Sequence, residues 1–189
     1  MTLSATSCSG QSAAVSHDPV AIADDFRAGM RMLAAGVCLI TTRQGDELGG
    51  MIATAVTSVS AEPPTLLVCI NRSASIFEMI EASQGFCVNV LATEAVPLVE
   101  QFSSSARRAE RFQSGAWSTS YSGSPVSADA VVAFDCHLAK KIDWHSHGIF
   151  LGEVRGVVHP RSGVGPLLYM DRRFHHLRDL PTSDKRATS

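Results

Sequence analysis

The chain has 189 residues, enough for one domain with a sizeable core. It is 45% hydrophobic and 18% charged, as in globular proteins, and its net charge of −2 gives no reason to expect nucleic acid or an anionic membrane as a partner. Its apolar runs fall far short of the roughly 20 residues of a membrane span, so we expect no such span. No Lys or Arg precedes Arg27, so we expect no signal peptide.

The chain reads as one domain over residues 20–180, between a disordered Ser- and Ala-rich tail at 1–19 and a polar tail at 181–189. Apolar residues at helical spacing predict a helix over 21–35. Two shorter helices are predicted over 75–83 and 95–102. The first of these begins with Ser75 and Glu78 in the spacing of a capping box.

Seven strands are predicted over 37–42, 49–60, 65–71, 86–91, 130–142, 149–159 and 167–170. Most links between them are too short for βαβ crossovers, so the pattern favours an antiparallel barrel or sandwich with peripheral helices. Asn89 is polar within an apolar strand and must find partners if it is buried. The polar segment 103–121 is predicted to be a long loop or a helical excursion outside the barrel.

The five cysteines are odd in number, widely spaced and contain no CxxC pair. We therefore expect reduced core cysteines in a cytoplasmic protein, and neither a disulfide framework nor a zinc site. The cysteines are Cys8, Cys38, Cys69, Cys87 and Cys136.

The segment 49–64, GGMIATAVTSVSAEPP, favours a strand but carries little bulk. Ala53 and Ala55 leave the backbone bare, and Pro63 and Pro64 end the strand. A lean strand of this kind leaves room for a flat, polar-edged ligand against its amides. The alternative is a partly buried strand packed under a helix.

Two further segments carry candidate binding groups. Asn71 ends a strand, and Arg72 and Ser75 precede a helix whose free amides could hold an anion, although a capped helix without ligand also explains Ser75. His145 and His147 are two residues apart and could form a metal pair on one strand face, but no third ligand is marked. The sequence contains no G-x-G-x-x-G turn and no Walker motif, so a dinucleotide would not be held by a Rossmann turn.

From about Phe26 to Phe174 the chain resembles the short flavin reductases, which are the reductase components of two-component flavin monooxygenases. The lean segment carries the family's Thr-Ala and Ser-Val-Ser-x-x-Pro-Pro features, and it departs from them at Ile52, where the family usually has Thr. The segment 147–154, HGIFLGEV, is similar to the family's His-containing strand, and Glu110-Arg111-Phe112 resembles an acidic-Arg-Phe triplet of the family.

The resemblance implies a flavin-binding split barrel, which is a Greek-key antiparallel barrel that usually forms a homodimer. It implies that His147 lies where nicotinamide docks on the flavin; the alternative is an exposed turn histidine. It gives only weak support to a phosphate role for Arg111. The implied cofactor-binding residues are Met51, Ile52, Thr54, Ala55, Val56, Asn71, Arg72, Ser75, Ile76, Gln101, Phe102, His147, Tyr169 and Arg172.

The activity implied is hydride transfer from NADH, or alternatively NADPH, to FMN or FAD. The reduced flavin would then diffuse to a separate oxygenase. Two other functions stay open on sequence alone: a non-catalytic flavin- or haem-binding module, and a flavin-dependent reductase of a corrinoid or metal complex.

Overall fold

The computed structural model describes residues 18–179, which fall into two compact units that are treated separately. The first unit ends at Leu33 and contains helix α1 (Pro19–Arg31), whose first turn is capped by Asp18 through a 3.1 Å bond from the Val20 amide. The helix is confirmed, but it ends before Ala35, because Ala35 and Gly36 pair with a strand of the second unit. The predicted tails lie almost wholly outside the described residues.

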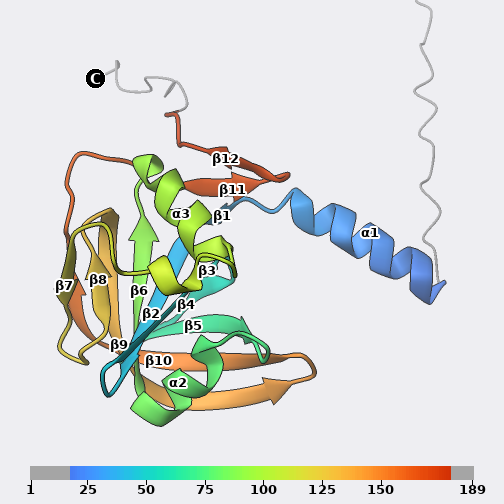
Figure 1. The fold of residues 1–189 in the computed structure, drawn as a ribbon. Coiled ribbons are helices and arrows are strands. Elements are labelled where there is room, and N and C mark those ends of the chain that lie inside the picture. Colours follow the sequence, from blue (N-terminus) through green and yellow to red (C-terminus); the bar gives the residue numbers. More distant parts are fainter. Residues whose placement is uncertain (1–17, 180–189) are drawn as a thin grey trace, which may run out of the picture. The chain divides into compact units, whose positions relative to one another are not determined.

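The second unit begins at Ala34 and is mainly β-structure, with every strand pairing antiparallel (Figure 1). Its strands are β1 (Ala35–Gly36), β2 (Cys38–Gln44), β3 (Glu47–Ala53), β4 (Val56–Ala61), β5 (Pro64–Asn71), β6 (Gly85–Leu91), β7 (Trp117–Thr119), β8 (Pro125–Ser127), β9 (Ala130–Trp144), β10 (His147–Val158), β11 (Leu168–Met170) and β12 (Arg173–His175). Its helices are α2 (Ile76–Ser83) and α3 (Val96–Ser103), and its 3-10 turns are η1 (Thr93–Ala95) and η2 (Arg108–Glu110).

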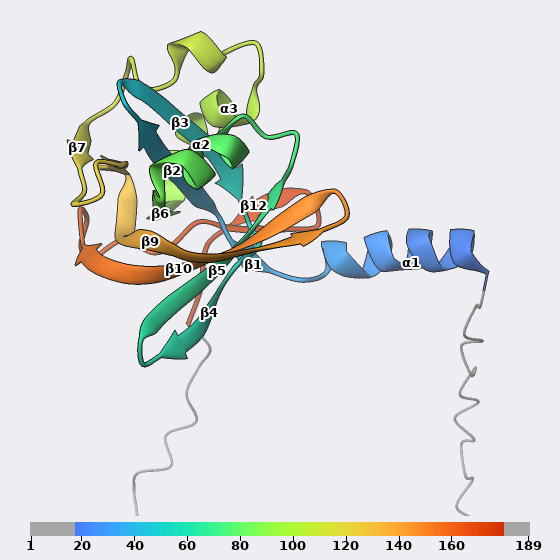
Figure 2. The same ribbon diagram turned by 90° about the horizontal axis from the view of Figure 1, so that it is seen from below.

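Seven strands form one sheet in the order β3-β2-β6-β9-β10-β5-β4 (Figures 1 and 2). The strands β3 and β4 are its two edges, yet β3 also contacts β5, the neighbour of β4, so the sheet curves round without closing into a complete barrel. The predicted antiparallel barrel is confirmed in this open, split form. The short strands β1, β11 and β12 form a second sheet, and β7 pairs with β8.

The lean segment was predicted as one strand over 49–60, and this prediction is wrong. Ala53 lies opposite Cys38, the first residue of β2, so β3 has no partner beyond that point. Thr54 and Ala55 belong to neither strand, and a strand resumes at Val56 as β4 beside β5. The break therefore arises because β2 begins at Cys38 and has no residue that could pair with Thr54.

Three apolar clusters of buried residues form the core of this unit, and the smallest contains Cys87, Val126 and Ala133. Of the two larger clusters, the first contains Ile40, Val68 and Phe150 with residues of α2, and the second contains Leu39 and Phe102 with further residues of α3. Helix α2 packs against β2 and β3, and α3 packs against β3. The strand β3 thus lies between two helices.

Asn89 and three of the four described cysteines of the sheet are buried, whereas Cys69 is only partly buried. The side chain of fully buried Asn89 donates to Leu39 O at 3.1 Å and accepts from the Ser127 amide at 2.9 Å, which confirms that it finds partners. The four cysteines of the described residues are free thiols, and burial raises the pKa of Cys38 and of Cys136 to about 12. Cys8 lies outside the described residues.

Candidate functional site

The outer edge of β3 carries backbone groups that no strand covers. Gly45 and Asp46 form a two-residue loop closed by the pair Gln44–Glu47, and hydrogen-bonded and non-hydrogen-bonded pairs alternate from there along an antiparallel ladder. The peptide groups of Gly50 and Ile52 consequently point away from β2, whereas the groups of the intervening residue, Met51, point into the ladder.

This alternation decides which of the predicted residues on β3 can offer a backbone group to a ligand. Ile52 presents its amide on the free edge, while the amide of Met51 faces β2 and its side chain packs on the first core cluster. Replacing the family's Thr by Ile52 removes a hydroxyl but leaves this backbone donor in place.

Thr54 and Ala55 connect the two edge strands of the open sheet directly. Both are exposed, and Ala55 O accepts a 3.0 Å hydrogen bond from the amide of Cys69 on β5. With Val56 at the start of β4, the predicted segment crosses from one edge of the split to the other. Its exposed backbone and small side chains fit a flat ligand.

His147 lies beside the end of β5. It is exposed, begins β10, and is directly opposite Asn71 in the β5–β10 ladder. Its Nδ1 lies 2.9 Å from the hydroxyl of Ser146, so Nε2 is the ring nitrogen without a partner among the described residues. The structure thus brings together two of the predicted residues that the sequence separates by 76 positions.

The neighbouring histidine does not share this strand face. His145 lies in the turn between β9 and β10 with a φ of +47°, so the metal pair considered for His145 and His147 on one strand does not form. Within residues 18–179 no group of three or more His, Cys, Asp or Glu side chains could hold a metal ion.

Two contacts of Arg72 hold the β9–β10 turn, which precedes His147, against the end of β5. The amide of Arg72 donates to Ser146 O at 2.9 Å, and its guanidinium pairs with Asp143 at 2.8 Å. Asp143 also accepts from Lys141, whose pKa is raised chiefly by its hydrogen bond to Glu81. No sequence pattern indicates that Arg72 and Asp143 are partners, because β5 and β9 are brought close only by the fold.

The turn before α2 differs from the predicted capping box. Ser75 occupies the N-cap position, but its backbone is already helical and its hydroxyl makes no hydrogen bond among the described residues. Asn71 orders the turn instead, because its Oδ1 accepts from both the amide and the hydroxyl of Ser73 at 2.9 Å. Ile76 is fully buried, so only its backbone could meet a ligand.

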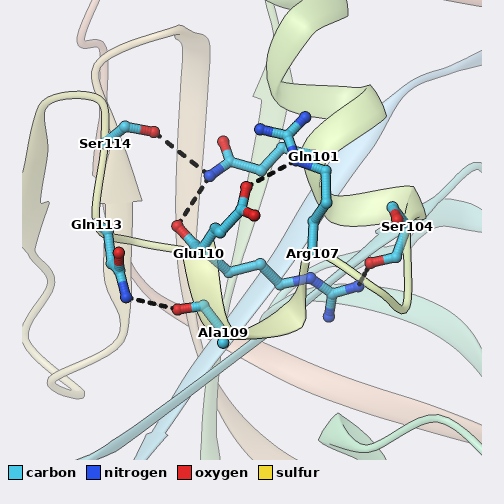
Figure 3. A network of polar contacts seen from close by, with 8 residues as sticks. Gln101, Ser104, Arg107, Ala109, Glu110, Gln113 and Ser114 are labelled. Carbon is cyan, nitrogen blue, oxygen red and sulfur yellow. Dashed lines mark hydrogen bonds and ion pairs between the residues drawn. The ribbon is translucent and has the colours of Figure 1, made fainter.

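Gln101 and Phe102 belong to the packing of α3. The Gln101 amide donates to Glu110 O at 2.9 Å and to Ser114 Oγ at 3.3 Å, which ties α3 to the following loop (Figure 3). Phe102 is 2% exposed and its ring meets Phe112 edge-on. A flavin contact by these two residues stays a prediction, with their side chains engaged inside the protein.

Arg111 uses its guanidinium on the protein backbone. It donates to Gly50 O at 3.0 Å, Phe102 O at 2.6 Å and Ser104 O at 3.2 Å. Burial, with Arg108 nearby, lowers its pKa.

Tyr169 and Arg172 lie in the hairpin of β11 and β12, which Figure 1 shows well above the turn between β9 and β10. Tyr169 packs against Phe174 with ring centroids 5.5 Å apart, and Arg172 is exposed in the turn with a φ of +61°. This chain does not bring them beside His147, so their contact with a cofactor stays a prediction.

A cavity of about 670 Å³ lies beside β3 and the start of α2. Sequence reasoning missed it, since its walls come from the β2–β3 hairpin and the loop after α3. Its lining residues include Gly49, Gly50, Ser75, Arg108, Arg111 and Phe112.

Comparison with known proteins agrees with this geometry. Residues 30–178 match the flavin reductase like domain family. The FMN reductase (NADH) RutF of Pseudomonas syringae pv. syringae (strain B728a) is 41% identical over 152 residues, which cover 80% of this chain and 85% of that protein.

Two solved structures share the fold. The NADH:FAD oxidoreductase SgcE6 of Streptomyces globisporus C-1027, in complex with NAD and FAD fragments, has a TM-score of 0.78 at 28% identity and covers 90% of this chain and all of its own. BorF, the flavin reductase component of a bacterial two-component tryptophan halogenase, has a TM-score of 0.75 at 27% identity over 84% of this chain and 99% of its own. The split barrel is therefore confirmed, and the chain belongs to the flavin reductase like domain family.

Proposed function

We propose that this protein is an NADH-dependent flavin reductase, which transfers a hydride to FMN or FAD and supplies the reduced flavin to a separate monooxygenase. The observation that carries the proposal is the uncovered edge of β3, which runs through Thr54 and Ala55 across the split toward the end of β5. Relatives named as NADH-dependent FMN reductases agree with it. The alternatives, a non-catalytic module and a corrinoid or metal-complex reductase, have no observation in their favour.

The residues present fit a flavin. The outward peptide group of Ile52 can exchange hydrogen bonds with the polar edge of the ring, and the free hydroxyl of Ser75 is available to its phosphate end. A bound flavin supplies the hydride-accepting chemistry itself. The protein's part is to orient the two partners and to stabilise the negative charge that develops at the flavin edge.

His147 is proposed to orient the nicotinamide. The Ser146 hydroxyl occupies Nδ1, so Nε2 is available to a nicotinamide carboxamide or to the flavin edge. Hydride transfer needs no strong acid or base, so this role is to position the reactants.

Consumption of NADH, followed by its absorbance, tests the proposal. The purified protein should oxidise NADH only when FMN or FAD is added, and NADH should bind weakly to the flavin-free protein. NADH consumption that is unchanged by flavin would overturn the proposal. Substitution of NADPH in the same assay decides which nicotinamide is preferred.

Two further parts of the proposal concern partners. Reduced flavin should leave by diffusion, so a separate monooxygenase should still form its oxygenated product when a dialysis membrane divides the two proteins. A homodimer is supported by β4, an exposed edge strand that includes Val59 at 52% exposure. Sedimentation analysis should give twice the chain mass, and a monomer at all concentrations would contradict the homodimer.

None of the helices within residues 18–179 has the length and apolar character of a membrane span.

A further inference from the structure

The guanidinium of Arg111 joins three segments that meet beside the proposed flavin site. It donates hydrogen bonds to the carbonyl oxygens of Phe102 and Ser104 at the C-terminal end of α3, which have no partner within the helix. Through Gly50 O it reaches the outer edge of β3. Its carbon atom Cζ also lies 5.4 Å from the centre of the Phe102 ring.

Gly50 is the point where this clamp meets β3. A Cβ added there would come within 2.6 Å of the Phe102 ring and 3.1 Å of the Phe112 ring, so the strand and the aromatic rings are in close contact. An edge strand lacks a second neighbour to hold its outer peptide groups. At Gly50, Arg111 takes the place of that neighbour.

The alternation along β3 relates this bond to the ligand edge. Side chains and peptide directions repeat every two residues in a strand, so the outward carbonyl of Gly50 and the outward amide of Ile52 lie on the same edge. A contact that fixes the direction of the Gly50 carbonyl therefore restricts the direction of the Ile52 amide.

We propose that Arg111 is a positioning residue for flavin binding: by holding Gly50 O, it sets the direction of the Ile52 peptide group that the flavin ring meets. This inference rests on the proposed function. It differs from a phosphate contact by Arg111, because the guanidinium is directed at backbone carbonyls and acts on the ring through β3.

The test compares Arg111→Lys and Arg111→Met with matched changes at Arg107. Arg107 lies in the same loop, and its guanidinium pairs with Glu110 at 2.8 Å and with no group of β3 among the described residues (Figure 3). Lysine at 111 keeps the charge and the aliphatic stem, yet one ammonium group cannot span the three carbonyls. Fluorescence titrations would use FMN and lumiflavin, which has the same ring and no ribityl phosphate.

We expect Arg111→Met to raise the Kd of FMN and the Kd of lumiflavin by a similar factor, about tenfold, which corresponds to one lost charged hydrogen bond. Arg111→Lys should fall between this variant and the wild type, and both Arg107 variants should bind like the wild type. Loss of FMN binding alone would replace the positioning role by a direct phosphate contact, and unchanged binding of both ligands would overturn the inference.

A stability measurement separates positioning from general loosening. Amide hydrogen exchange should show faster exchange in Arg111→Lys at Gly49 and Met51, whose amides face β2, with the amides of β9 unchanged. Equal acceleration in β9 would mean a general structural role and overturn the inference. If the wild-type protein binds neither ligand, the proposed function itself fails, which is a different result.

Discussion

His147 and Asn71 lie directly opposite each other where β10 begins and β5 ends. The first presents a free ring nitrogen, and the second orders the turn that leads into α2. One residue proposed for the nicotinamide and one proposed for the flavin thus share a single cross-strand pair.

The first prediction concerns this pair. His147→Ala should raise the KM for NADH by a factor equivalent to about 1–2 kcal/mol, the value of one hydrogen bond, and should change the flavin Kd less. Steady-state kinetics and flavin titration would measure the two effects. His145→Ala is the control, since His145 lies in the adjacent turn. An unaltered KM would mean that His147 is an exposed residue with no part in nicotinamide binding.

The second prediction concerns the close approach at β3. Gly50→Ala should lower the free energy of unfolding by about 1–3 kcal/mol, because the new methyl group would overlap the Phe102 ring. Gly36→Ala is a matched control, since a Cβ at Gly36 meets no atom within 4 Å. Urea denaturation would compare the two variants. Equal effects would show that the strand can move away from α3.

The third prediction concerns the buried amide of Asn89. Asn89→Ala should cost about 1–3 kcal/mol of stability, because the Ser127 amide loses its acceptor in a site without water access. Gln113→Ala removes an exposed amide that bonds Ala109 O, and it should change stability by less than about 0.5 kcal/mol. Thermal denaturation followed by circular dichroism distinguishes these outcomes.

The fourth prediction concerns the buried thiols. Burial raises the pKa of Cys38 and Cys136 to about 12, and it raises that of Cys87 as well. In the unfolded chain these thiols ionise near pH 9, so above that pH the folded state holds more protons than the unfolded state. The free energy of unfolding should therefore fall as the pH rises from about 9 toward 12.

Urea denaturation at a series of alkaline pH values measures this slope. Cys38→Ala should reduce the slope, by at most about 1.4 kcal/mol per pH unit, while leaving the contributions of other alkaline groups in place. A slope unchanged by the substitution would mean that this thiol ionises equally in both states. With a thiol reagent at pH 8, the three buried thiols should react only after unfolding.

The sequence by itself determined most of the local structure and the family. Apolar runs and turn residues placed β5, β6, β9 and β10 within a few residues, because the buried positions of these strands require apolar side chains. The short links determined that the sheet is antiparallel. The motifs around the lean strand and His147 were specific enough to imply a flavin reductase, and the comparisons confirm it.

Only the tertiary structure decided how those elements meet. The break at Thr54 and Ala55 depends on where β2 begins, and propensity along the chain carries no record of that. The roles of Gly50 and Arg111 depend on α3 and β3 approaching closely, a contact between positions 61 residues apart. Local sequence records what each residue favours, whereas the identity of a distant partner follows from the packing of the whole sheet.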